Sequence, residues 1–403
     1  MTNYEDWGVP LALNGVGPAT RMGGVPMARE VWQAMERALD HPVRMDALQA
    51  GAGAHLARLL GVPAVYVTSG ASAALVLATA AAMTRGRAEL IDQLPHAAGM
   101  RHRVVIQSAQ RDPYDRAAEA AGATLVPVGY PESTHPGELE RAIDDDTAAV
   151  LYRPGRAGNL LPLEATARIA HAAGVPVIVD GALFAPPVQR LQAFFEAGAD
   201  LVCVSGGKGF RGPQGSGLLC GSPELIGFIA AQHQDMDERD TTWPVAAGTG
   251  TGITPPRHGI GRAMKVGREQ LVGLVVAIER YLRDPGADER PGIEELDDLE
   301  STLLAGGAIA VRREFDRALN VPYLELDTGK SGLAIDAVIH ALAERAVPVY
   351  LGEAEAWRGV LTVNPMALGS GHGRQIAEAV IEVVEALGAD PDSAQAASEH
   401  WRP

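Results

Sequence analysis

A chain of 403 residues, 47% of them hydrophobic and 21% charged, is long enough for two globular domains, and its composition excludes a mainly disordered protein. Acidic residues outnumber basic ones by 50 to 34, and the resulting net charge of −16 argues against a nucleic-acid partner because it repels the phosphate backbone. Cys203 and Cys220 are too few for a disulfide framework, and their spacing fits no zinc site.

The N-terminus is acidic and precedes no apolar region of the kind found in signal peptides. No uncharged apolar run reaches the roughly 18 residues that a bilayer crossing requires. We therefore expect a cytoplasmic protein without a membrane partner.

Short Val/Ile/Leu-rich runs alternate with Ala-rich stretches of helical length through the first half of the chain. We expect strands at 64–68, 103–107, 124–127, 148–152, 176–180, 200–205 and 216–220. Strong helix formers fill the stretches 71–83, 163–173 and 188–198 between them. This alternation predicts an α/β domain built on a seven-stranded, mostly parallel sheet.

The last two runs, 200–205 and 216–220, are separated by only ten residues, which is fewer than a parallel crossover needs. We expect these two strands to be antiparallel, with Lys208 in the loop that connects them.

The C-terminal third has fewer elements and predicts a small α+β domain. The segment 257–283, after a Gly/Thr/Pro-rich stretch, predicts one long helix that leads into this domain. The domain itself is expected to hold strands near 307–314, 323–327, 347–351 and 359–364 and helices near 333–345 and 372–387. The expected organisation is an N-terminal segment 1–45, a large domain 46–256, a linking helix 257–285, a small domain 286–390 and a tail 391–403.

The segment from Thr68 to Ser72 falls where a strand ends and a helix rich in small residues begins. The free N–H groups and positive dipole of a helix N-terminus suit a phosphate group. Ser and Thr also cap helices for structural reasons, and the sequence leaves both interpretations open. Neither GxGxxG after a first strand nor GxxxxGK[ST] occurs, so the fingerprints of Rossmann dehydrogenases and P-loop enzymes are missing.

Asp180 ends an apolar strand, at the sheet edge where α/β proteins bind ligands. Two interpretations of Asp180 are open: its carboxylate forms an ion pair with a protonated pyridine nitrogen, or it caps the next helix. Lys208 follows 28 residues later in SGGKGFRGPQGSG, whose six glycines allow a ligand to approach the backbone closely. A lysine shielded from water beside other cations, such as Arg211, has the lowered pKa that attack on an aldehyde requires.

An isolated loop lysine is usually a solvated charge. Here the segment from Thr68 to Ser72, which we call the phosphate seat, is followed in the chain by a strand-end Asp and a strand-end Lys. This order favours a cofactor site. The chain resembles the fold-type I pyridoxal-phosphate enzymes, in particular the branch of bacterial selenocysteine synthase and D-glucosaminate-6-phosphate ammonia-lyase. The similar segments are 19–35, 45–75, 110–123, 179–187, 204–219 and 259–274, of which the SGGK-to-GPQ block is the most specific.

The resemblance implies that pyridoxal 5'-phosphate is the cofactor and that Lys208 binds it as a Schiff base. It makes Asp180 the partner of the pyridinium nitrogen. The residues around the phosphate would be Ser69, Gly70, Ala71 and Ser205. Either Tyr114 or Gln110 would cover the face of the ring, and the sequence does not choose between them.

In such enzymes the active site lies at a subunit boundary, which implies a homodimer or a higher even oligomer. Either the RMGG segment with Arg21 or the GPQ loop with Gln214 would then reach the neighbour's cofactor. Many relatives clamp the substrate carboxylate with a small-domain arginine. The only arginines in the corresponding region are Arg358 and Arg374, and Arg374 is the candidate, although a plain surface charge explains it equally well.

The resemblance favours a lyase that removes the α-proton of an amino acid or amino sugar acid and expels a β-substituent. An aminotransferase, racemase or aldolase on the same scaffold is the alternative. A selenocysteine-synthase-like transferase acting on charged tRNA is disfavoured by the net charge and by the lack of an additional N-terminal module. A non-catalytic protein that kept the fold is disfavoured because both Asp180 and Lys208 are retained.

Two acidic stretches could suggest metal ligands. His233, Asp235 and Asp237 alternate as H-x-D-x-D, and Asp residues fill 144–146. In acidic segments of this kind solvated surface charges are the commoner explanation, so we expect no metal site.

Overall fold

The computed structural model describes residues 4–155, 158–234, 237, 258–328 and 332–389. The chain divides into two compact units, which we call the large unit (residues 27–280) and the small unit (residues 1–26 and 281–403). The N-terminal residues belong to the small unit because β1 (Leu13–Asn14) pairs in parallel with β11 (Val349–Tyr350).

The large unit is built on a seven-stranded sheet, as the sequence predicts. Its strands, in spatial order, are β2 (Ala64–Thr68), β8 (Gly217–Gly221), β7 (Leu201–Ser205), β6 (Val177–Asp180), β5 (Thr147–Tyr152), β3 (Arg103–Gln107) and β4 (Thr124–Val128). All neighbours are parallel except β8, which runs antiparallel to both β2 and β7. The predicted antiparallel pair with Lys208 in its loop is therefore confirmed.

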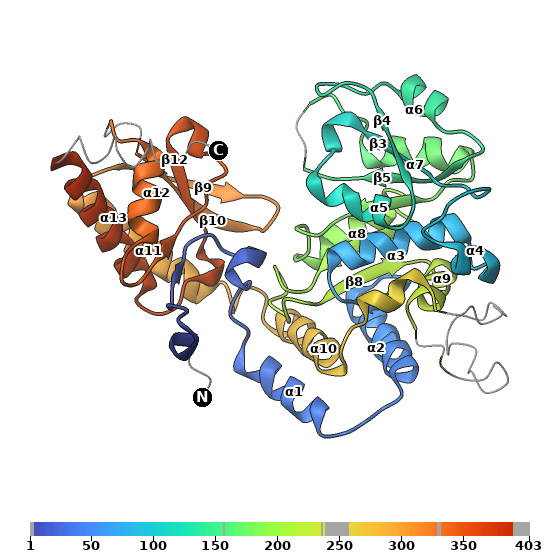
Figure 1. Ribbon diagram of the computed structural model, residues 1–403, viewed down its shortest axis with the longest axis horizontal. Coiled ribbons are helices and arrows are strands. Elements are labelled where there is room, and N and C mark those ends of the chain that lie inside the picture. Colours follow the sequence, from blue (N-terminus) through green and yellow to red (C-terminus); the bar gives the residue numbers. More distant parts are fainter. Residues whose placement is uncertain (1–3, 156–157, 235–236, 238–257, 329–331, 390–403) are drawn as a thin grey trace. The chain divides into compact units, whose positions relative to one another are not determined.

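Strands β6 and β7 are buried at every residue because helices cover both faces of the sheet. Helix α3 (Ala71–Thr84), labelled in Figure 1, lies against β5, β6, β7 and β8, and all its residues from Ala73 to Thr84 are buried. Its alanines allow this close packing between the sheet and neighbouring helices. The other helices that begin in this unit are α1 (Arg29–Leu39), α2 (Met45–Leu60), α4 (Ala88–Gln93), α5 (Arg116–Ala120), α6 (Pro136–Ala142), α7 (Leu163–Ala172), α8 (Val188–Glu196), α9 (Pro223–His233) and α10 (Arg268–Arg283).

The long helix expected over 257–283 is wrong in its first part. The structure has a 3-10 turn, η5 (Ile260–Met264), followed by extended backbone at Lys265, and α10 begins only at Arg268. Glycine is a poor helix former, and here Gly261 is needed for close packing. A Cβ atom on Gly261 would lie 2.5 Å from the Leu77 side chain and 2.7 Å from the Gln232 carbonyl oxygen. Residue 257 lies outside the described residues.

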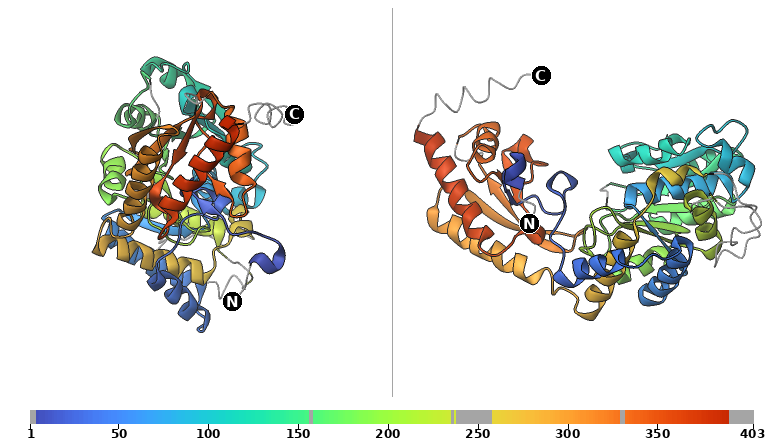
Figure 2. Two further views of the ribbon diagram at one scale, coloured as in Figure 1. Left: turned by 90° about the vertical axis from the view of Figure 1, so that its left-hand side faces the viewer. Right: turned by 60° about the horizontal axis from the view of Figure 1, so that its bottom comes forward.

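The small unit contains a three-stranded antiparallel sheet in the order β12 (Val360–Val363), β10 (Val321–Asp327), β9 (Ala310–Asp316). Helices α11 (Arg290–Gly306) and α13 (His372–Ala389) lie side by side along it, as both views in Figure 2 show, and α12 (Ile335–Ala343) packs on α13. Helix α11 is not among the elements expected from the sequence. The expected tail 391–403 lies outside the described residues.

The predicted fold class, a mostly parallel seven-stranded sheet with a small α+β C-terminal part, is confirmed. Within the described part of the chain, no helix combines the length and the apolar character needed to cross a membrane.

Candidate active site

Several strands of the large unit end at one edge of the sheet. Because β8 is antiparallel to both β2 and β7, Thr68 at the end of β2 and Ser205 at the end of β7 both pair with Gly217 at the start of β8. Asp180 at the end of the next strand, β6, pairs with Cys203. The phosphate-seat segment, Ser205, Asp180 and the loop that holds Lys208 are therefore gathered at the same edge, where α/β sheets bind ligands.

The turn between β2 and α3 leaves the N-terminus of α3 without a side-chain cap. Its N-cap residue is Gly70, with φ of 131°, a value that favours glycine. The Thr68 hydroxyl donates to the Gly70 carbonyl oxygen (3.0 Å), and the Ser69 hydroxyl donates to the Met264 carbonyl oxygen (2.8 Å). The capping interpretation of this Ser/Thr segment is therefore wrong, and the first N–H groups of α3 suit an anionic ligand.

Gly217 fits this turn only because it lacks a side chain. A Cβ atom there would lie 2.6 Å from the Gly70 carbonyl carbon and 2.9 Å from the Gly70 Cα. The start of β8 thus packs directly against the backbone of the phosphate seat.

The glycine-rich loop folds tightly around Lys208. The Gly206 N–H donates to the Ser216 carbonyl oxygen (2.9 Å), and the Arg211 N–H donates to the Lys208 carbonyl oxygen (3.0 Å). A Cβ atom on Gly207, the residue before Lys208, would lie 2.7 Å from the Gln214 Cα, so Gln214 packs against Gly207 within the loop. The glycines are needed for these close approaches.

Burial lowers the pKa of Lys208, as the sequence analysis expects of a Schiff-base lysine. The Asp180 carboxylate opposes this shift, and the positive charge of Arg153 adds to it. The contributing cation is thus Arg153, whereas the sequence analysis named Arg211. A larger fraction of the Lys208 amine is neutral and nucleophilic than for a solvated lysine.

Asp180 is 8% exposed and combines both interpretations that the sequence left open. Its Oδ1 accepts a hydrogen bond from the Ala182 N–H (3.2 Å), which orders the turn after β6. Its charge also acts on Lys208, and together with burial it raises the pKa of the Cys203 thiol. Cys203 is therefore a buried, protonated core residue.

Gln110 and Tyr114, the two candidates for covering a cofactor ring, have different surroundings. Gln110 is buried, and its Oε1 accepts a hydrogen bond from the backbone N–H of Arg153 (3.2 Å), while its side chain also bonds to Tyr152. Tyr114 is 60% exposed on the 3-10 turn η4 (Pro113–Asp115). Gln110 therefore has a structural role at this sheet edge. Which of the two residues covers a cofactor ring stays a prediction.

Arg153 is the site residue that the sequence analysis missed. It follows β5 directly, and its side chain is mostly buried in an ion pair with Asp112. Its position after an apolar strand, the same signal that identified Asp180, could have found it.

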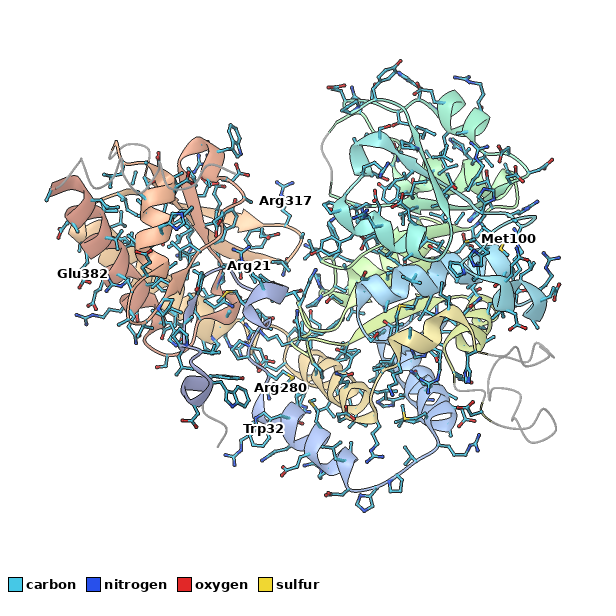
Figure 3. All side chains as sticks on the ribbon, viewed as in Figure 1. Arg21, Trp32, Met100, Arg280, Arg317 and Glu382 are labelled. Carbon is cyan, nitrogen blue, oxygen red and sulfur yellow. The ribbon has the colours of Figure 1, made fainter. Side chains whose placement is uncertain are left out.

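The candidate substrate arginines lie in the small unit. Arg21 is on the 3-10 turn η2 (Thr20–Met22) and pairs with Glu353 (3.4 Å); Figure 3 labels it. Arg374 on α13 pairs with Glu378 one turn later (2.8 Å), and its side chain is 75% exposed. Arg358 pairs with Glu325 and Glu355. A substrate role for Arg21 or Arg374 remains a prediction.

The expectation that the H-x-D-x-D run is solvated surface is wrong for His233. His233 ends α9 and is buried against Tyr66 of β2, because the last turn of α9 packs on β2 and η5. Asp237 is exposed and pairs with His258 (2.9 Å), and Asp235 lies outside the described residues. In the 144–146 stretch, Asp144 pairs with Arg103. No group of three or more metal-binding side chains occurs in the described parts of the chain.

A cavity of about 360 Å³ lies beside Tyr66 and His233 and is lined also by Arg44, Gln49 and Lys265. It does not include Lys208. We locate the candidate active site at the sheet edge instead, because the partly buried lysine, the carboxylate and the open helix N-terminus occur together there.

The chain is similar to known proteins over most of its length. The family model of aminotransferase class-V matches residues 43–264, more than half of the chain and all of the sheet edge just described. D-glucosaminate-6-phosphate ammonia lyase of Salmonella typhimurium is 28% identical over 389 residues, covering 95% of this chain and 98% of its own. A 5'-C-glycyluridine monooxygenase-decarboxylase of a Streptomyces species is 27% identical over 382 residues, covering 91% and 88%.

A solved structure of D-glucosaminate-6-phosphate ammonia-lyase superposes with a TM-score of 0.77 at 27% identity, over 97% of this chain and 100% of the other. The resemblance stated from the sequence is confirmed by these matches.

Proposed function

The chain belongs to the aminotransferase class-V family, whose membership implies pyridoxal phosphate, and we propose that it is a pyridoxal-phosphate-dependent lyase acting on an amino acid or amino sugar acid. The observation that carries the proposal is the meeting of Lys208, Asp180 and the uncapped N-terminus of α3 at one sheet edge. This donor set fits the cofactor: an amine for an aldehyde, a carboxylate for a ring nitrogen and N–H groups for a phosphate.

Each of these residues has a distinct task. The N–H groups from Ala71 onward, with Ser69 and Ser205, would hold the phosphate. The Asp180 carboxylate would keep a proton on the ring nitrogen. Lys208 would hold the cofactor through its Nζ atom. When bound, pyridoxal phosphate supplies a ring that accepts electron density from the substrate α-carbon.

The Lys208 amine would also serve as the general base towards the substrate α-carbon. Its lowered pKa leaves a larger fraction of the amine neutral than in a solvated lysine, and the neutral amine is the form that can remove a proton from the substrate α-carbon. In a β-elimination the β-substituent leaves with its bonding electrons, a double bond forms between the α- and β-carbons, and Lys208 can return the proton to the leaving group. Burial of Lys208 limits competition by water for this proton.

The named activity of the ammonia lyase supports elimination over the alternatives. The monooxygenase-decarboxylase is almost equally similar and bears a different activity, so the reaction must be tested directly. We propose to incubate the protein and pyridoxal phosphate with D- and L-amino acids and 2-amino sugar acids, among them D-glucosaminate 6-phosphate. The enamine product of the elimination would tautomerise to an imine that water hydrolyses, so ammonia and a keto acid should appear without an added keto acid. Keto acid formation only with a second keto acid would indicate an aminotransferase, and an inverted enantiomer alone a racemase.

We further propose a homodimer or higher even oligomer, in which Arg21 or Gln214 reaches the neighbouring subunit's site. Mass measurement by light scattering during size-exclusion chromatography tests the assembly, and a monomer that is fully active would contradict it. Arg21→Ala and Arg374→Ala test the substrate contacts, because loss of a carboxylate clamp raises KM more than it lowers kcat.

A further inference from the structure

Two side chains, His233 and Ser69, share one backbone carbonyl next to the phosphate seat, and a third, Tyr66, bonds to His233. The Tyr66 hydroxyl lies 2.9 Å from Nδ1 of His233, and Nε2 of His233 lies 3.0 Å from the carbonyl oxygen of Met264. The same oxygen accepts the hydrogen bond from the Ser69 hydroxyl (2.8 Å). A continuous chain of hydrogen bonds thus links the core of the large unit to Ser69.

The chemistry of the acceptor fixes the direction of every bond in this chain. A carbonyl oxygen only accepts, so His233 donates through Nε2–H. Burial lowers the pKa of His233, so its ring is neutral near pH 7 and its Nδ1 carries a lone pair. The Tyr66 hydroxyl therefore donates to Nδ1, and the Gln234 amide completes the bonding of Tyr66.

Ser69 has a single hydroxyl hydrogen, and in this structure it points to Met264. Because phosphate oxygens of a dianion only accept, Ser69 can donate to a phosphate only by leaving the Met264 carbonyl. Without His233, that carbonyl would then lose its side-chain donor in a partly buried position, which is unfavourable. With His233 in place, the Met264 carbonyl keeps a side-chain donor.

We propose that His233, oriented by Tyr66, is a positioning residue that holds the Met264 carbonyl so that the Ser69 hydroxyl can turn to the cofactor phosphate. The inference rests on the proposed cofactor site. It assigns no catalytic step to His233, which acts only through Ser69.

The test compares the affinity of the full-length apoprotein for pyridoxal 5'-phosphate and for pyridoxal, which has no phosphate, by absorbance titration. His233→Leu should weaken binding of the phosphate form by about tenfold, the effect of one lost hydrogen bond to a charged group, and leave binding of pyridoxal unchanged. His233→Gln, which keeps an N–H donor, should recover part of the loss. Tyr66→Phe should give a smaller loss and serves if His233→Leu does not fold.

A double-mutant cycle with Ser69→Ala separates this role from a general structural one. In the Ser69→Ala background, His233→Leu should cause no further loss of affinity. Equal losses in both backgrounds, or equal losses for pyridoxal and its phosphate, would overturn the inference. If wild type and His233→Leu bind the cofactor equally well, the inference fails while the proposed function stands; if wild type binds none, the proposed function fails as well.

Discussion

Asp180 ends β6 and Lys208 follows the neighbouring parallel strand β7, and their charges are coupled: burial lowers the pKa of Lys208, while the Asp180 carboxylate raises it. Arg153, after the next strand, lowers it further. The balance of these three effects sets how much of the Lys208 amine is neutral.

Removing the charge of Asp180 and removing the charge of Arg153 should shift the Lys208 pKa in opposite directions. Asp180→Asn removes the charge that stabilises the ammonium form, so the pKa should fall. Arg153→Met removes a repulsive charge, so the Lys208 pKa should rise. The chain has only three lysines, Lys208, Lys265 and Lys330, which makes the measurement simple. The pH dependence of acetylation of each lysine in the apoprotein, followed by peptide mass, gives the shift, with the exposed Lys265 as internal control. Identical profiles for Lys208 in all variants would contradict the coupling.

Gln110 and Tyr114 should differ in their effect on stability. Gln110→Ala leaves the Arg153 N–H without its acceptor in a partly buried position, which should cost about 1–3 kcal/mol of unfolding free energy. Tyr114→Ala removes an exposed ring and should change stability by less than about 0.5 kcal/mol. Urea unfolding measures both. Whichever variant also loses affinity for pyridoxal phosphate identifies the residue that covers the ring; a stable Gln110→Ala protein would contradict the structural role.

Gly217→Ala should destabilise the large unit, because its Cβ would overlap the Gly70 backbone. Overpacking against a backbone that cannot move freely should cost about 1–3 kcal/mol and weaken cofactor binding. Gly51→Ala is the matched control: a Cβ there meets nothing within 4 Å, and in the helix α2 alanine should stabilise by up to about 1 kcal/mol. Similar effects of the two changes in urea unfolding would show that the contact at Gly70 is unimportant.

Protonation of His233 should lower the free energy of unfolding in mild acid. Its pKa in the folded protein lies below the unfolded value of 6.5, so the unfolded chain binds a proton first as the pH falls. The stabilisation is therefore complete above about pH 6.5 and is lost as the pH falls toward the lower folded-state pKa. His233→Gln removes this titration, and its unfolding free energy should change less between pH 7.5 and 5.5 than that of wild type. An unchanged difference between the two pH values would contradict the assignment.

Local signals in the sequence predict much of the sheet edge. The ten-residue spacing between the last two strands is enough to make them antiparallel and to place Lys208 in their loop, because no parallel crossover fits. Asp180 ends an apolar run, which predicts its place at the sheet edge, and the same signal applies to Arg153 after β5.

Features set by long-range packing were not predictable in this way. His233 stands in an acidic segment that indicates a solvated surface, yet its burial depends on Tyr66, 167 residues away in the chain. The break before α10 depends on Gly261 packing against Leu77 and Gln232, which no helical pattern reveals. The Ser69 hydroxyl was expected to cap a helix or bind phosphate, and its bond to Met264 again joins distant segments.

The most direct test of the central claim is to locate the covalently bound cofactor. The protein is incubated with pyridoxal phosphate, reduced with borohydride and digested, and the peptides of all three lysines are examined by mass spectrometry, with Lys208→Arg as control. We predict a phosphopyridoxyl group on Lys208 alone and none in the variant. Labelling of Lys265 or Lys330 in place of Lys208, or equal labelling of the Lys208→Arg protein, would contradict the assignment of this sheet edge as the active site.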